Sequence, residues 1–74
     1  MSVFDLKKGE SGKITKISAR GAVAARLGSV GIQCGQIVTA LAFSLFNSSI
    51  LVGVGYSRVA LRRAVAQLIE VSPQ

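Results

Sequence analysis

The chain has no histidine, a single cysteine and only three acidic residues among its 74. Cys34 could act as a nucleophile only beside a general base or a cation, and the nearest charged residue in the sequence is Arg26. We therefore expect Cys34 to be a small apolar residue in the turn before a strand, and we expect no catalytic site. A single cysteine also excludes an intramolecular disulfide, which fits a reducing cytosol.

The same shortage limits metal binding. A structural or transport site needs three or four ligands drawn from cysteine, histidine, aspartate and glutamate. This chain offers Cys34 and three scattered acids, Asp5, Glu10 and Glu70. We predict no cofactor and no intramolecular metal site, and we leave open a weak coordination that is shared with a partner at an interface.

Glycines at positions 28, 31 and 35 surround the cysteine. The stretch RLGSVGIQCGQIV nevertheless lacks both the GxGxxG spacing and the GK[ST] ending of phosphate-binding loops. Because glycine adopts left-handed backbone conformations without steric cost, we interpret these residues as the end of a helix and a turn into a strand. We expect the helix to stop at Gly28 or Gly31.

Aromatic residues make up 5% of the chain, so the core has to be built from Ala, Val, Ile and Leu. Nine Lys and Arg against three acids give a net charge of +6, which favours an anionic partner. Nucleic-acid modules usually interleave such charges with rings on which bases stack, and here only three Phe and one Tyr are available. We therefore favour solvated basic faces over a nucleic-acid surface.

Charge is absent from positions 27–57, and part of this run is long enough to cross a bilayer as a helix. Polar residues at 47–49 interrupt it. The flanking segments, 37–43 and 50–56, are rich in residues typical of strands, so we predict a hairpin rather than a membrane span. The amino terminus has no apolar run behind its lysines, so we expect no secretory signal.

The first third of the chain predicts one strand and one helix. In SGKITKIS, residues 11–18, the two isoleucines are three positions apart, which indicates a strand with a bulge or bend. Residues 20–30 predict a short helix that has Val23 and Leu27 on its apolar side.

The last third predicts a second helix and a closing strand. Ser57 is placed to cap a helix over 57–64, with Leu61 and Val65 on its inner side. Arg58, Arg62 and Arg63 would lie on this helix, the last two near its carboxyl end, where the helix dipole favours cations. A strand over 67–71 ends the chain. Four strands and two helices in so short a chain predict a partly closed barrel that hides the sheet edges.

The hairpin tip, SLFNSSI at 44–50, allows two interpretations. Leu45 and Phe46 fold inward, or they form an exposed apolar knob that is suited to a partner. The residues alone leave both open.

Three groups of residues, in order along the chain, resemble the FeoA family of ferrous iron transport proteins. The resemblance runs from Leu6 to Val71. The first group is similar to a family pattern of leucine, spaced glycines and isoleucines, and the other two are similar to its Arg-Leu, Leu-Gly-Ile, Pro-Gly, Val signature and its Leu-Arg, Ala, Ile, Val ending. The matching residues are Leu6, Gly9, Gly12, Ile14, Ile17; Arg26, Leu27, Val30, Gly31, Ile32, Gly35, Val38; and Leu61, Arg62, Ala66, Ile69, Val71.

The resemblance implies a mostly β fold, a small SH3-like β-barrel with two short α-helices, in one domain over 1–74 with its core at about 6–71. It also implies a cytoplasmic accessory protein that acts beside the membrane-embedded ferrous iron transporter and its GTP-binding domain. Family-level binding of Fe²⁺ or another transition metal ion is implied too. Cys34 stands where the family often has proline, and SLFNSSI replaces a connection containing Gly or Pro.

We therefore expect a non-enzymatic protein that docks on the cytoplasmic side of the transporter, at the inner face of the membrane, through an apolar and basic surface. The alternatives are a small-barrel nucleic-acid-binding module and a stand-alone regulator-type SH3-like domain. The expected contact residues are Arg26, Leu45, Phe46, Tyr56, Arg58 and Arg62.

Overall fold

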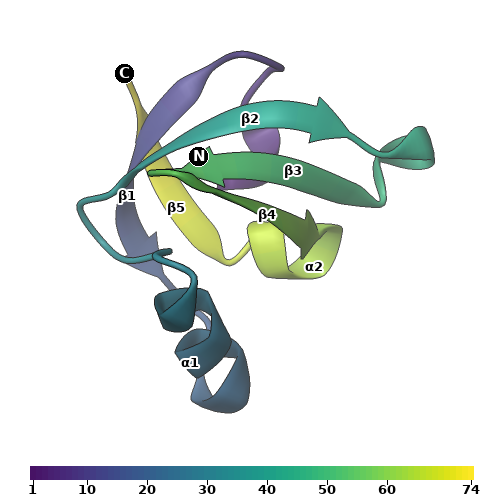
Figure 1. Cartoon of the computed structure of the whole chain (residues 1–74). Coiled ribbons are helices and arrows are strands. Elements are labelled where there is room, and N and C mark those ends of the chain that lie inside the picture. Colours follow the sequence, from purple (N-terminus) through teal and green to yellow (C-terminus); the bar gives the residue numbers. More distant parts are fainter.

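Five short aliphatic strands form one curved antiparallel sheet in the computed structural model, which describes residues 1–74 (Figure 1). The sheet order is β4-β3-β2-β1-β5. Two helices and two short 3₁₀ turns complete the chain. In order, the elements are η1 (Val3–Asp5), β1 (Ser11–Ile17), α1 (Gly21–Ser29), β2 (Ile37–Phe43), η2 (Leu45–Asn47), β3 (Ser49–Val54), β4 (Ser57–Arg62), α2 (Arg63–Ala66) and β5 (Ile69–Pro73).

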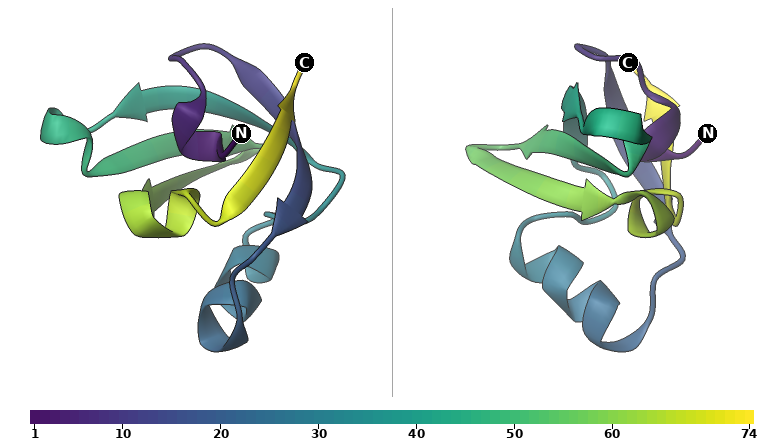
Figure 2. Two further views of the ribbon diagram at one scale, coloured as in Figure 1. Left: turned by 180° about the vertical axis from the view of Figure 1, so that it is seen from behind. Right: turned by 90° about the vertical axis from the view of Figure 1, so that its right-hand side faces the viewer.

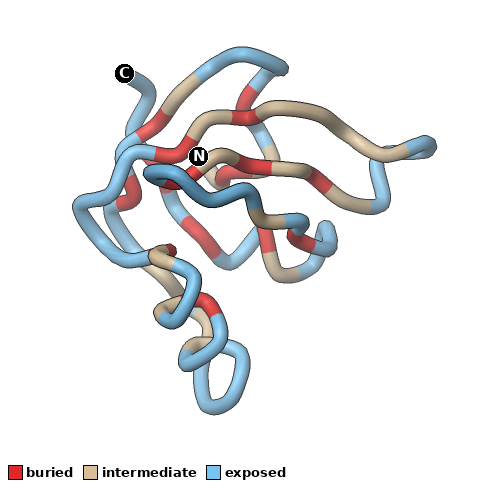
Figure 3. Tube along the Cα trace, viewed as in Figure 1, coloured by how far each residue is buried: buried red, intermediate tan, exposed pale blue.

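The core is built only from Ala, Val, Ile and Leu, as the scarcity of aromatic residues predicts. Fourteen such residues form one buried cluster, and no polar or charged residue is buried with them. Buried positions lie mostly on the strands, whereas α1 is largely exposed (Figure 3). Phe4 and Phe43 pack against the edge of the cluster with their rings edge to face, 5.6 Å apart.

Two β-bulges bend the sheet. The first interrupts the pairing of β1 with β5 between Ile14 and Lys16, which confirms the irregularity that the isoleucine spacing predicts. The second interrupts the pairing of β2 with β3 between Ala40 and Ala42, and no sequence pattern indicated it. A bulge adds one unpaired residue to a strand and increases its twist, so the two bulges together curve the sheet around the aliphatic core.

The predicted hairpin is confirmed, but the predicted second helix is wrong over most of its length. Residues 57–62 form β4, which pairs with β3 in six consecutive registers, and only 63–66 form the helix α2. Ser57 is therefore the first residue of a strand and caps nothing. A helix of eight residues is marginal in water, whereas β3 offers a full row of hydrogen-bonding groups to the same residues.

The strands form a curved open sheet, whereas the sequence predicts a partly closed barrel. Its edge strands are β4 and β5, which lie at the two ends of the strand order and do not pair with each other. The second strand of the hairpin spans 49–54 rather than 50–56, and the last strand spans 69–73 rather than 67–71. Residues Val3–Asp5 contact β5 and α2, so the beginning of the chain lies against its end (Figure 2).

Helix α1 projects from one end of the sheet in each view (Figures 1 and 2). It lies within the predicted range, and Leu27 is its only buried residue. Val23, expected on the inner side, is 41% exposed. The helix ends before Gly31, whose φ of +90° is the left-handed conformation predicted for one of the two stop glycines. Neither helix is long and apolar enough to span a membrane.

Candidate partner-binding surface

An apolar cleft lies between the projecting helix α1 and the edge strand β4. Its volume is about 270 Å³. Leu27 is the only buried residue of α1, and it lines the cleft together with Val23 of the same helix. One wall carries Val23 from α1 and Val30, which directly follows the helix, and the other carries Val59 and Leu61 from β4.

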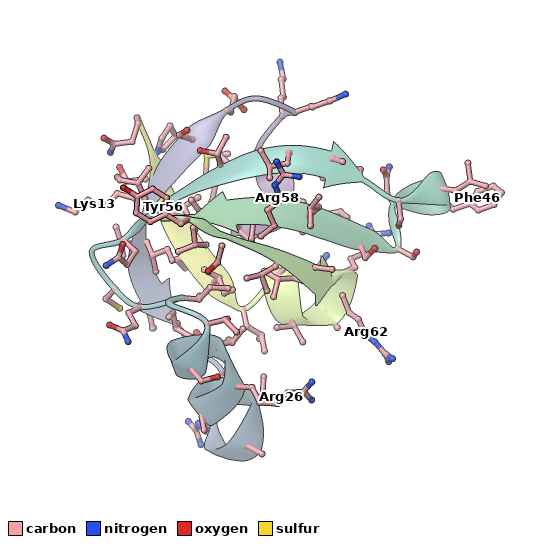
Figure 4. The ribbon with its side chains drawn as sticks, in the orientation of Figure 1. Lys13, Arg26, Phe46, Tyr56, Arg58 and Arg62 are labelled. Carbon is pink, nitrogen blue, oxygen red and sulfur yellow. The ribbon has the colours of Figure 1, made fainter.

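Two arginines flank this cleft. Arg26 comes from the last turn of α1 and Arg62 from the end of β4, and both line the cleft. Figure 4 shows them on the two sides of the space between helix and sheet. The tertiary structure therefore brings together two predicted contact residues that are far apart in the sequence.

No lysine or arginine side chain forms a salt bridge in this structure. All three acids have other partners: Asp5 accepts the backbone N–H of Ser2 at 2.9 Å, Glu10 accepts that of Lys7 at 2.7 Å, and Glu70 pairs with the N-terminal amine at 3.2 Å. Arg63 forms a cation–π contact, with its guanidinium carbon 5.3 Å from the ring centre of Phe4. Arg26 and Arg62 thus carry charges that no acid of this chain neutralises.

The hairpin tip projects outward, which settles the question that the residues left open. Leu45 is 79% exposed and Phe46 is 89% exposed. Figure 4 shows Phe46 at the far end of the β2–β3 hairpin. The tip thus presents two adjacent apolar side chains beyond the end of the sheet (Figure 4).

Hydrogen bonds from serine hold the tip in an unusual backbone conformation. Phe46 has φ of +64° and Asn47 has φ of +54°, in the left-handed region that a bulky side chain rarely adopts. The N–H of Ser49 donates to the hydroxyl of Ser44 at 2.8 Å, and that hydroxyl lies 2.9 Å from the hydroxyl of Ser48. These bonds close the loop, and the Phe46 ring is exposed outside it.

Tyr56 and Arg58 lie at the opposite end of the sheet from the tip. Tyr56 is fully exposed in the two-residue turn between β3 and β4, where Gly55 has φ of +58°. Arg58 lines a shallow hollow with it on the outer face of the sheet. By the elements that carry them, the six predicted contact residues form three groups: the tip pair, the cleft arginines and the pair at the β3–β4 turn.

Sequence reasoning missed the cleft wall from β4. The helix predicted over 57–64 does not place Val59, Ala60 and Leu61 beside α1, whereas the strand β4 does. The segment SRVALR did carry a signal, because Val59 and Leu61 alternate with Arg58, Ala60 and Arg62 at the period of a strand. Leu61 is buried and its two neighbours are exposed, as that alternation requires.

Cys34 lies in the turn before β2, as predicted, and its side chain is exposed. The turn is docked on β1, since the N–H of Gly35 donates to the carbonyl of Ile14 and the N–H of Ile14 donates to that of Gln36, both at 2.8 Å. No group of three or more Cys, His, Asp or Glu residues lies close enough together to hold a metal ion.

The FeoA domain family model matches residues 1–73 of this chain. No curated protein matches the sequence of this chain.

Several solved structures have the same fold. Iron(II) transport protein A from Clostridium thermocellum has 23% identity and a TM-score of 0.93; the match covers 99% of this chain and 45% of that one. FeoA from Chlorobium tepidum has 29% identity and a TM-score of 0.93, with 99% and 70% covered. Stenotrophomonas maltophilia FeoA, an SH3 domain protein solved with zinc, has 28% identity and a TM-score of 0.82, with 97% and 89% covered. This chain thus spans less than half of the Clostridium protein.

Proposed function

The chain belongs to the FeoA domain family, and from this premise we propose that it is a non-enzymatic accessory protein of ferrous iron uptake. Two of the matched structures support the proposal: one is named as an iron(II) transport protein, and the other has been suggested to act as a ferrous iron transport activating factor. The proposed partner is the membrane ferrous iron transporter with its GTP-binding domain, approached from the cytoplasm.

The observation that carries this proposal is an apolar and basic surface without a partner in its own chain. The tip presents Leu45 and Phe46 almost fully exposed, and the cleft is flanked by Arg26 and Arg62 without an acid nearby. Exposed rings and unpaired arginines are the residue types that dominate the energetics of protein interfaces. The mechanism is that of an adaptor, in which the surface recognises the transporter and no bond of a substrate is made or broken.

The test is binding to the purified transporter in detergent, and separately to its GTP-binding domain, measured by biolayer interferometry. We expect Phe46→Ser and Arg62→Glu each to weaken binding about ten-fold, the loss typical of a central interface residue. Lys13→Glu is the matched control for charge, because Lys13 is exposed and lies away from both the cleft and the tip (Figure 4). Unchanged affinity in both variants, or no binding by the unaltered chain, would refute the proposal.

The nucleic-acid alternative is separated in the same experiment by salt. Affinity for a nucleic acid falls steeply as ionic strength rises, because phosphate contacts release counterions. We expect binding of a mixed-sequence 20-mer DNA duplex to be weaker than binding of the transporter at physiological salt. The reverse order would favour the nucleic-acid-binding module.

We also propose that ferrous iron is cargo of the transporter and not a ligand of this chain. The only thiolate source, Cys34, has no second cysteine or histidine near it, and the three acids are scattered. Anaerobic calorimetric titration with Fe²⁺ tests this point, and we expect no saturable heat. A one-to-one complex that Cys34→Ser abolishes would contradict it.

A further inference from the structure

The two edges of the sheet are treated differently by the rest of the chain. The β5 edge is covered: the N–H of Val71 donates to the carbonyl of Met1 at 2.8 Å, and Ser2 forms a β-bridge with Glu70. Pro73, at the end of the same strand, has no N–H to offer. No segment of the chain pairs with the outer side of β4. An uncovered edge strand is a template for pairing with another chain.

The register of β4 shows which groups are free. Val54 and Ser57 pair across a two-residue turn, so they exchange both backbone hydrogen bonds. Six residues after Ser57, the N–H of Arg63 donates to the carbonyl of Ser48 at 3.0 Å. Ser57 and Arg63, an even number of residues apart, therefore both direct their backbone groups toward β3. Hydrogen bonds in an antiparallel ladder alternate, so every second residue of β4 faces outward. The backbone groups that point away from β3 are those of Arg58, Ala60 and Arg62.

The space beside this edge has a defined chemistry. On one face of the pleat, Val59 and Leu61 adjoin the apolar cleft, where Val23 of α1 and Val30 just after it form the opposite wall. On the other face, Arg58 and Arg62 alternate with the small residue Ala60, and Ala60 and Arg62 also reach the rim of the cleft. A strand added to β4 would therefore meet aliphatic side chains on one of its faces and two unpaired cations on the other.

A second copy of this chain is a poor occupant of the edge. Antiparallel pairing of two β4 strands about a two-fold axis at Ala60 would place Arg58 of each copy opposite Arg62 of the other. Like charges directly opposite each other destabilise a strand pair. Since neither arginine has an acid partner in this chain, the edge repels its own copy and favours a strand that carries carboxylates.

We propose that β4 binds an extended acidic segment of a partner protein by antiparallel strand addition. The segment alternates aliphatic residues, which enter the cleft against Val59 and α1, with Asp or Glu, which face Arg58 and Arg62. Backbone hydrogen bonds to β4 supply affinity, and the two faces supply specificity. This inference rests on the proposed function in one respect, since the segment would belong to the cytoplasmic part of the transporter.

The first test uses a peptide and the unaltered chain. The probe is an acetylated and amidated seven-residue peptide that alternates aspartate or glutamate with valine, titrated into ¹⁵N-labelled protein. At saturation we expect hydrogen exchange of the N–H groups of Arg58, Ala60 and Arg62 to slow by at least about ten-fold, because these groups become hydrogen-bonded. A peptide with lysine at every acidic position should bind about ten-fold more weakly. Equal binding of both peptides, or protection that grows with protein concentration in the absence of peptide, would overturn the proposal.

Backbone methylation of the peptide tests the pairing itself. Residues directly opposite each other in an antiparallel ladder have their side chains on the same face, so the acidic residues of the segment would lie opposite Arg58, Ala60 and Arg62. The backbone groups of these three residues point outward, so the acidic residues would form the hydrogen-bonded pairs and direct their own N–H groups at β4. We expect N-methylation of the acidic residues to abolish binding and N-methylation of the valines to leave it within about two-fold. Equal affinities of the two methylated peptides would exclude strand addition, because they contain the same side chains.

A variant of β4 links the peptide to the transporter. Ala60→Pro removes an outward N–H and leaves the hydrogen bonds to β3 in place, as an edge strand tolerates; Ala60→Val keeps the N–H and is its control. We expect Ala60→Pro to lose at least about ten-fold in affinity for both peptide and transporter, provided that its spectrum is that of a folded chain. Transporter binding unaffected by Ala60→Pro would refute this inference and leave the adaptor proposal standing. If the unaltered chain bound the peptide but not the transporter, strand addition would stand and the adaptor proposal would be refuted.

Discussion

Glycine substitutions at the hairpin tip test whether the backbone there is strained. Phe46 has φ of +64°, and the left-handed region costs an ordinary L residue roughly 1–2 kcal/mol. Its side chain is 89% exposed, so truncation removes about a tenth of the roughly 1.5–3 kcal/mol that full burial provides. Glycine at this position also makes the unfolded chain more flexible, which lowers the free energy of unfolding by about 0.4–1 kcal/mol. Phe46→Gly should therefore leave stability unchanged or raise it slightly.

Leu45→Gly is the matched control, because it makes the unfolded chain equally more flexible but relieves no left-handed backbone strain. Leu45 is 79% exposed, and its φ is not positive. The difference between the two variants isolates the left-handed strain, which we expect to be about 1–2 kcal/mol in favour of Phe46→Gly. For a domain of this size 1 kcal/mol shifts the melting temperature by roughly 4–8 °C, so the two variants should differ by about 4–16 °C.

Differential scanning calorimetry of both variants gives the result directly, and urea unfolding gives an independent free energy of unfolding. If Phe46→Gly melts at or below the temperature of Leu45→Gly, the tip is not strained and the reasoning fails. The same variant should bind the transporter more weakly, because the exposed ring is lost. Greater stability combined with weaker binding is the behaviour expected of strain retained at a functional site.

Four further substitutions test the packing and the turn. Gly12→Ala should lower the free energy of unfolding in urea by about 1–3 kcal/mol, because the added Cβ would lie 3.0 Å from the Cβ of Val71. Gly28→Ala is the control, because a Cβ at that position has no atom within 4 Å, and it should raise the free energy of unfolding by about 0.5–1 kcal/mol. Equal effects of the two substitutions would contradict the packing. Leu27→Ala should cost about 2–5 kcal/mol, because it removes the only buried residue of α1, and a loss below about 1 kcal/mol would mean that the helix does not anchor there. Cys34→Ser should change stability by less than about 0.5 kcal/mol and leave transporter binding intact, and a loss of binding would give the exposed thiol a role.

The sequence predicted what depends on local preference and composition. The core composition follows from the abundance of aliphatic residues and the scarcity of rings. The hairpin follows from the polar residues at 47–49, and the helix stop from Gly31, whose backbone is left-handed as expected. The family was visible too, because its residues recur in order over most of the chain. Each of these features depends on a few neighbouring residues and needs no distant contact.

The outward tip and the grouping of the contact residues were beyond the sequence. Leu45 and Phe46 are apolar, and nothing in SLFNSSI states which way they point. In the structure, the N–H of Ser49 donates to the hydroxyl of Ser44 and closes the loop, and both apolar side chains are exposed outside it. Arg26 and Arg62 lie far apart in the chain, and only the placement of α1 beside β4 makes them two sides of one cleft.

The sequence by itself determined an aliphatic, glycine-punctuated β protein with a basic surface, because composition, period and turn residues act over short distances. Only the tertiary structure decided that SRVALR is a strand, since the row of hydrogen-bonding groups offered by β3 outweighs the helical preference of Ala, Leu and Arg. It also decided which edge stays open. Met1 and Ser2 reach β5 through contacts that span nearly the whole chain, and no such segment reaches β4.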